Sequence, residues 1–406
     1  MDSKVDGGCT FQIDRHAPIM GWRLSLRTPA RLMLVLSASA LTFFSKVSLT
    51  QCDSHGIMMQ LPWTVALLQT LGLGLCVLPG VFRYAAAAMR AGRAVIASSG
   101  VSSGHEESDP LDQSRYAAAL DYARVALFGC IRGVACVLSM AGLQYLHISQ
   151  YLCLKSLLFV FVSIASHFRR KNFFRYHVVG AIVGTAGSAL VCTSVALYIV
   201  RVDQPLPCAA PSDPSPHILG AMPLVFGAAY VGISQIFLAA LSCLEETFLS
   251  RVNIDTQLFM GLQGIFGAFF ISLCCIAVIY TPALLSQDTS SISALLRLGH
   301  EDVLQGLSSI VHSTPLAVSF SVIVATSCLS VVFCIITTQH ATPSWRLVLE
   351  LAKILLLWAF GVYLNASSAA HRDWTLPSEA WLPQSVVLTL GLLLAAIAQA
   401  IYHRCV

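Results

Sequence analysis

Two lysines lie deep inside long apolar runs of the sequence, where a charged side chain could bind an anion. Lys155 and Lys353 each come eight residues after the start of their runs, 147–167 and 345–365. At 1.5 Å per residue each would lie about 12 Å along a membrane-spanning helix, and a charge at the centre of such a helix costs roughly 2.5–3.5 kcal/mol. Their surroundings also match, as KSLLFVF and KILLLWA. Two such lysines could hold a phosphate or a carboxylate through charge-assisted hydrogen bonds. Alternatively each pairs with a neighbour, since Glu350 precedes Lys353 by three residues on one helix face.

Other polar residues inside apolar runs are further candidates for substrate binding. Arg132 and Lys46 would add positive charge, although Lys46 could simply extend its amine to the membrane surface. Tyr151 and Gln235 could line a cavity or serve in contacts between helices. Basic residues inside the runs outnumber the one acid, Glu350, by four; they are Lys46, Arg124, Arg132, Lys155 and Lys353. This excess of positive charge favours an anionic solute.

Two glutamates end the sixth apolar run. Glu245 and Glu246 could form a gate with Arg251, and Glu350 is a third candidate gating residue. The alternative for Glu245 and Glu246 is a solvated helix end.

The sequence lacks the patterns of an enzyme or an ATP-driven pump. It has no Walker-type phosphate loop and no Cys/His cluster with metal-ligand spacing. His147 and His167 both lie at the ends of apolar runs rather than at catalytic spacing. We therefore expect a protein that is not an enzyme and needs no cofactor or metal.

The composition is that of a protein embedded in a lipid bilayer. Of the 406 residues, 56% are hydrophobic and 11% are charged, whereas soluble domains carry roughly 25% charged residues. A soluble enzyme and a nucleic-acid-binding protein are excluded by this balance. Ten of the fourteen cysteines fall inside apolar runs, where thiols pack as small apolar groups. Whether Cys52 and Cys208, in loops on one side, form a disulfide is left open.

Ten apolar runs of about 20 residues predict an all-α polytopic membrane protein with ten transmembrane helices. The N-terminal segment and the loops after the second and fourth runs are rich in Lys and Arg, which places both termini in the cytosol. The predicted spans are 31–50, 62–82, 122–142, 147–167, 177–200, 219–243, 257–280, 315–337, 345–365 and 383–403.

The loops divide the chain into two halves of five spans. A cytosolic segment, 1–30, precedes the first half, 31–200, which contains a flexible, Ser/Gly-rich cytosolic loop at 83–121. A Pro-rich luminal linker, 201–218, leads to the second half, 219–403. The second half contains a luminal loop, 281–314, whose apolar residues predict an interfacial helix or a loop packed on the bundle. Residues 404–406 form a short tail.

Several segments resemble a known family of carriers. They are HFRRKNFFRYHVVGAIVGTAGSALV (167–191), LEETFLSR (244–251), GLQGIFGAF (261–269), HEDVLQGL (300–307) and TQHATPSWRLVLELAKILLLWAF (338–360). Together they resemble the drug/metabolite transporter superfamily, and within it the F-type branch of solute carrier family 35, which is nucleotide-sugar-transporter-like and related to the chloroquine-resistance transporters. The chain departs from that branch at Gln263, where an acidic residue is usual, and it lacks the cysteines of the chloroquine-resistance type in the loop 281–314.

This resemblance implies two inverted five-helix repeats that work by alternating access, with the substrate near the bilayer midplane. In phosphate-carrying relatives, lysines in the helices of Lys155 and Lys353 hold the substrate's phosphate. We therefore expect a secondary-active carrier of a small organic anion, such as a nucleotide sugar or phosphorylated metabolite. It would lie in an endomembrane (Golgi, vacuole or lysosome) rather than the plasma membrane.

Two alternatives remain open. One is an exporter of peptides, amino acids or cationic drugs from an acidic organelle, and the other is a non-transporting membrane adaptor. The partners expected are the small-molecule solute and the bilayer, with homodimer formation left open.

Overall fold

The computed structural model describes the helical part of the chain. The described residues are 27–50, 61–79, 81–82, 111–169, 175–201, 222–249, 252, 254–280, 308, 313–340, 384–402 and several residues between 353 and 364. Within these residues every regular element is a helix. The fold is therefore all-helical, as the composition predicted.

The described helices follow the apolar runs of the sequence. They are α1 (Arg27–Leu49), α2 (Pro62–Gly74), α4 (Leu111–Tyr145), α5 (Ile148–Lys155), α6 (Leu157–Arg169), α7 (Arg175–Arg201), α8 (Met222–Leu249), α9 (Thr256–Tyr280), α13 (Thr314–His340) and α15 (Gln384–Tyr402). Seven helical segments are long and apolar enough to cross a membrane. Six of them lie within α1, α4, α7, α8, α9 and α13, and the seventh, Pro62–Pro79, begins with α2 and continues five residues beyond it. Ile148–Val162 and Val386–Ala398 are shorter apolar helices. The protein is a multi-pass membrane protein.

Seven of the ten predicted spans correspond to these seven long helices. The fourth, 147–167, is divided into α5 and α6 by one residue of turn at Ser156. The tenth, 383–403, corresponds to α15, whose apolar core is shorter. Of the ninth, 345–365, the described residues between 353 and 364 are helical, and the rest lies outside the described residues.

The flexible loop predicted at 83–121 ends earlier than expected, because α4 already begins at Leu111. The segment LDQSRYAAALDY (111–122) is rich in Ala, Leu, Gln and Arg, which favour a helix even though its polarity resembles that of a loop. The linker 201–218 beyond Arg201, the interfacial helix predicted within 281–314 apart from a few residues, and Cys52 and Cys208 lie outside the described residues.

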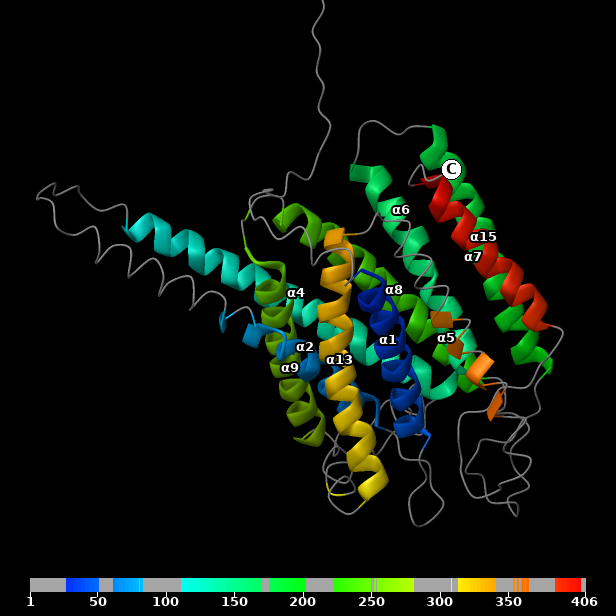
Figure 1. Cartoon of the computed structure of the whole chain (residues 1–406), viewed down its shortest axis with the longest axis horizontal. Coiled ribbons are helices and arrows are strands. Elements are labelled where there is room, and N and C mark those ends of the chain that lie inside the picture. Colours follow the sequence, from blue (N-terminus) through cyan, green and yellow to red (C-terminus); the bar gives the residue numbers. More distant parts are fainter. Residues whose placement is uncertain are drawn as a thin grey trace, which may run out of the picture.

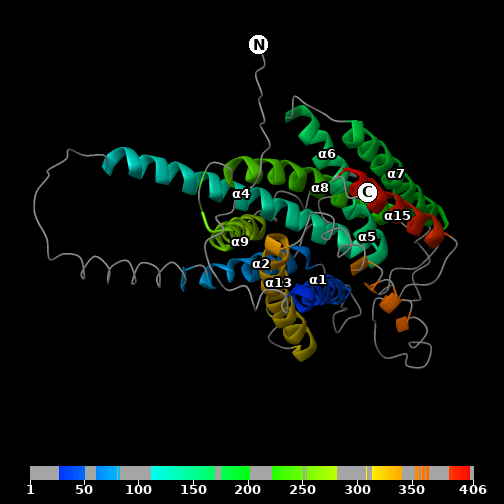
Figure 2. The ribbon, with the colours of Figure 1, turned by 45° about the horizontal axis from the view of Figure 1, so that its top comes forward.

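The helices of the two halves pack against one another rather than forming two separate bundles (Figure 1). Each of these helices of the first half packs along helices of the second: α7 along α15, α1 along α13, and α4 along both α8 and α9. In addition, α2 packs against α9 and α13. The pair α7–α15 forms one side of the bundle in both views (Figures 1 and 2).

Glycine pairs allow backbones to touch where the halves meet. A Cβ atom added to Gly187 on α7 would lie 2.7 Å from the carbonyl oxygen of Gly391 on α15, and one added to Gly391 would lie 2.8 Å from the oxygen of Gly187. Reciprocal close approaches also join Gly142 of α4 to Gly227 of α8. Small residues at such crossings are how membrane helices gain packing without a hydrophobic driving force.

The apolar core consists of two clusters. The larger contains buried side chains of α1, α2, α4, α5, α7, α8, α9, α13 and α15. The smaller, which we call the end cluster, contains Val125 and Phe128 of α4, Leu241 and Phe248 of α8, and Phe259 of α9. The end cluster thus involves three helices from both halves.

Candidate functional site

An ion pair joins the two halves of the protein in the interior of the bundle. Nη2 of Arg132, on α4, lies 2.8 Å from Oε1 of Glu245, on α8. The side chain of Arg132 is 21% exposed and that of Glu245 is 15% exposed. The pair is therefore largely withdrawn from solvent, where charge-assisted hydrogen bonds are strong.

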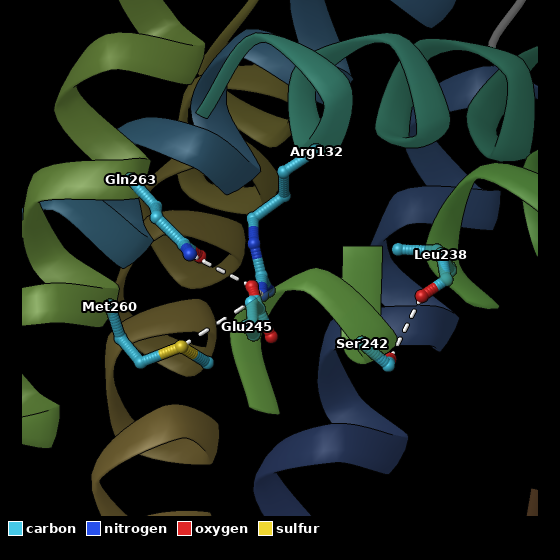
Figure 3. A network of polar contacts seen from close by, with 6 residues as sticks. All are labelled: Arg132, Leu238, Ser242, Glu245, Met260 and Gln263. Carbon is cyan, nitrogen blue, oxygen red and sulfur yellow. Dashed lines mark hydrogen bonds and ion pairs between the residues drawn. The ribbon is translucent and has the colours of Figure 1, made fainter. Parts of the chain in front are cut away.

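Two residues of α9 complete this group, which we call the ion-pair cluster (Arg132, Glu245, Met260 and Gln263). Glu245 lies between Arg132 and Gln263 (Figure 3), and Nε2 of Gln263 donates to Oε1 of Glu245 over 2.8 Å. Nη2 of Arg132 also approaches Sδ of Met260 at 3.8 Å. Among the described residues, Nε of Arg132 and Oε1 of Gln263 are buried with no hydrogen-bond partner. The cluster therefore retains one donor and one acceptor that it does not use.

The end cluster lies directly beside the ion-pair cluster on the same three helices. Phe128 and Phe259 precede Arg132 and Gln263 by four residues, and Phe248 follows Glu245 by three. The rings of Phe128 and Phe248 are 5.6 Å apart edge to face, and those of Phe248 and Phe259 are 5.6 Å apart and stacked. On each of α4, α8 and α9, about one helical turn therefore separates a phenylalanine of the end cluster from a residue of the ion-pair cluster.

A second polar group continues along the same face of α4, one and two turns after Arg132. The thiol of Cys136 donates to Oε1 of Gln69 on α2 over 3.3 Å, and Nε2 of Gln69 donates to Oγ of Ser45 on α1 over 2.9 Å. Oγ of Ser139 and the hydroxyl of Tyr151 are 2.7 Å apart. Polar side chains of α1, α2, α4 and α5 thus converge inside the first half.

Lys155 lies next to this polar group. It is the last residue of α5, before the turn at Ser156, and its Nζ lies 4.7 Å from the centre of the buried Tyr151 ring. A cation over an aromatic face is stabilised by the ring quadrupole. Three of the predicted substrate-binding residues, Arg132, Tyr151 and Lys155, are therefore brought to the same region of α4.

Lys46 has a different environment. Its buried amine donates to the carbonyl oxygens of Leu143 at 2.8 Å and Gln144 at 3.0 Å, at the C-terminal end of α4. A cation is favoured there because the last carbonyls of a helix have no partner within it. Lys46 thus joins α1 to the end of α4.

The remaining predicted site residues are not brought into these clusters by any described contact. Lys353 is buried, and Phe360 of the same segment packs edge to face against Phe43 of α1 at 5.2 Å. Gln235 is buried and donates to Oγ of Ser234 on its own helix over 2.9 Å. Glu246 is exposed. Glu350 and Arg251 lie outside the described residues.

Several residues of these clusters had not been predicted as functional. Gln69, Cys136 and Met260 lie in apolar runs with no pattern that marks them, and Gln263 had been noted for its residue type alone. A lone glutamine inside an apolar run is a usable signal, because its amide needs a partner there. Gln69 and Gln263 both meet that criterion.

The fold and these clusters define a polytopic helical membrane protein with charged and polar groups in its interior. No family model matches the chain. The chain is 25% identical over 142 residues to solute carrier family 35 member F6 of mouse, and likewise to that of rat. The matched stretch covers 35% of this chain and 37% of each relative, so the similarity is distant and partial. It suggests a transporter rather than an enzyme.

Proposed function

We propose that this protein is a secondary-active carrier of a small organic anion, such as a nucleotide sugar or a phosphorylated metabolite, in an endomembrane. The observation that carries the proposal is the position of Lys155, inside the fourth apolar segment and beside the bonded pair Tyr151 and Ser139. The distant similarity to a solute carrier supports transport as the activity.

The surroundings of Lys155 suit an anion. Its amine brings positive charge into a predicted span, where a charge is costly, and it lies 4.7 Å from the ring centre of the buried Tyr151. Tyr151 and Ser139 add hydroxyl groups within the same region.

The packing of the helices supports two inverted repeats. We number the predicted spans from one to ten and exchange each span with the one five positions away. This exchange turns the contact between α1 and α13 into the contact between α8 and α4. It also turns the contact between α4 and α9 into that between α13 and α2. The contacts α2–α9 and α7–α15 map onto themselves. Contacts between α6 and α8 correspond in the same way to the contact of Phe43 with Phe360. Such a relation is the one that an inverted repeat requires.

The same exchange relates the fourth span to the ninth, and so relates Lys155 to the buried Lys353. Two lysines from opposite repeats would supply a pair of positive charges to one phosphate. Both termini would lie in the cytosol, from the distribution of basic residues in the loops.

Uptake by proteoliposomes tests this function. Wild type should take up one or more members of a panel of labelled nucleotide sugars, sugar phosphates and amino acids. K155A should abolish uptake of the anion at unchanged protein level, and K155R should retain part of it. R124A, which alters a half-exposed arginine of α4, is the matched control and should transport normally. Wild-type uptake by K155A, or uptake of amino acids or cations alone, would contradict an anion carrier.

A further inference from the structure

We propose that Arg132 is an anion-binding site whose resident counter-ion is Glu245, and that an anionic group of the solute releases α8 by replacing the Glu245 carboxylate. The inference rests on the proposed function in taking the solute to be an anion. It assigns Arg132 and Glu245, which the sequence had suggested for separate roles, to one exchange of partners.

The ion-pair cluster joins α8 to the closely packed pair α4 and α9. Helices α4 and α9 touch through their backbones next to the cluster, since a Cβ added to Gly129 would lie 2.8 Å from the carbonyl oxygen of Gln263. Glu245 is the residue by which α8 bonds to both of them at this level. The close approach of α8 to α4 at Gly142 and Gly227 lies 18 residues before Glu245, about 27 Å along α8. The movement that the proposal requires is a pivot of α8 about this close approach.

Arg132 needs an anion whenever Glu245 leaves. A guanidinium cannot lose its proton in a protein, and an unpaired charge in this interior is costly. Nε of Arg132 is buried and unpartnered among the described residues, so an oxyanion could bind Nε and Nη2 together, in the two-point geometry that suits phosphate and carboxylate. The ligand class is therefore a phosphate or a carboxylate.

Gln263 contributes a second polar contact for the ligand. Its side chain is fully buried, at 0% exposed, and its Oε1 has no partner among the described residues while its Nε2 is bonded to Glu245. That oxygen can accept a hydrogen bond from a hydroxyl group of the ligand. An oxyanion that carries a hydroxyl group, as a sugar phosphate or monohydrogen phosphate does, would engage both unused groups.

The end cluster makes this movement local. Phe128, Phe248 and Phe259 pack with one another in a core separate from the larger one. Displacement of α8 at this end would part these rings, whereas Val231, the buried residue that α8 adds to the larger core, lies near Gly227 toward the other end of the helix. Arg132 and Glu245 are both partly exposed.

Phosphate binding by the purified full-length protein tests the proposal. Thermal unfolding midpoints are measured in detergent, with inorganic phosphate titrated against chloride at matched ionic strength. We expect E245Q to reach half of its phosphate-dependent stabilisation at a concentration about tenfold lower than wild type, because the competing carboxylate is gone. D121N, which removes the acid of the exposed ion pair on α4, is the matched control and should behave as wild type.

The double variant R132Q/E245Q keeps the interior neutral and so avoids an unpaired charge. It should lose the phosphate dependence of E245Q. Equal phosphate dependence in wild type and E245Q, or full retention in the double variant, would overturn the proposal. If K155A/E245Q loses the dependence while R132Q/E245Q keeps it, phosphate binds at Lys155, so the anion carrier stands and the exchange at Arg132 does not.

Discussion

The strength of the Arg132–Glu245 pair can be measured by a double-mutant cycle with R132Q, E245Q and R132Q/E245Q. R132Q leaves the Glu245 carboxylate, and E245Q leaves the Arg132 guanidinium, largely buried and in contact with neutral groups. Removal of one member of a buried pair costs about 3–5 kcal/mol, and hydrogen bonds to charged groups contribute about 1.5–3 kcal/mol. With the side chains 21% and 15% exposed, we take the lower part of these ranges. We expect a coupling free energy of about 2–3 kcal/mol.

A second ion pair on the same helix serves as the control. Nη1 of Arg124 lies 3.1 Å from Oδ1 of Asp121, three residues earlier on α4, and the two side chains are 50% and 34% exposed. Solvent screens such a pair, and the expected coupling is about 0.3 kcal/mol. Both cycles change an arginine of α4, but the acid lies on α8 in one pair and on α4 itself in the other. The difference between the two couplings therefore reports burial, the contact between helices and the bond from Gln263.

The assay is equilibrium unfolding in mixed detergent micelles, followed by circular dichroism in phosphate-free buffer. Both cycles are measured with the same fraction of denaturing detergent, so that effects on the unfolded chain cancel. A coupling free energy for Arg132–Glu245 no larger than that of the control would refute the reasoning, because it would mean that water screens the pair fully.

Two further predictions concern the contacts between the halves. G187A should destabilise the protein by about 1–3 kcal/mol, because the added Cβ would lie 2.7 Å from the Gly391 carbonyl oxygen. The control G232A, whose added Cβ has nothing within 4 Å, should be neutral or stabilising. Equal unfolding transitions in the two variants would contradict this prediction. Copper phenanthroline and oxygen should join Cys76 of the second apolar segment to Cys328 of α13, whose Sγ atoms are 3.7 Å apart, the two thiols losing two protons and two electrons to form one S–S bond. After cleavage at a protease site inserted into the linker 202–217, the halves should stay together on a non-reducing gel in wild type and separate in C328A, and separation in both would show that this contact does not form.

The membrane-spanning segments could be predicted from the sequence because their cause is local. An apolar run of about 20 residues in a bilayer must satisfy its own backbone hydrogen bonds, and a helix does so within the run. The seven long helices accordingly lie where apolar residues are continuous. The extension of α4 back to Leu111 was missed because polar and Ala-rich residues are compatible with both a loop and an exposed helix.

The candidate residues were found from the same principle, since a charge inside an apolar run is costly wherever the chain goes. Their partners could not be found that way. Glu245 is 113 residues from Arg132, and nothing in either local sequence indicates that α4 and α8 are neighbours. Lys46 likewise has no local sign that it will bond to carbonyls 97 and 98 residues away.

The apolar runs and the charges within them are therefore enough to identify a helical membrane protein, to locate its long spans and to show which residues carry charge into the bilayer. Only the tertiary structure decided which helices touch, through the close approach of glycines such as Gly187 and Gly391. The packing also brings Arg132 and Glu245 into one ion pair and places the Lys46 amine on the carbonyl oxygens at the C-terminal end of α4. The physical reason is that burial is a cost each residue incurs alone, whereas compensation of that cost requires a partner that only packing supplies.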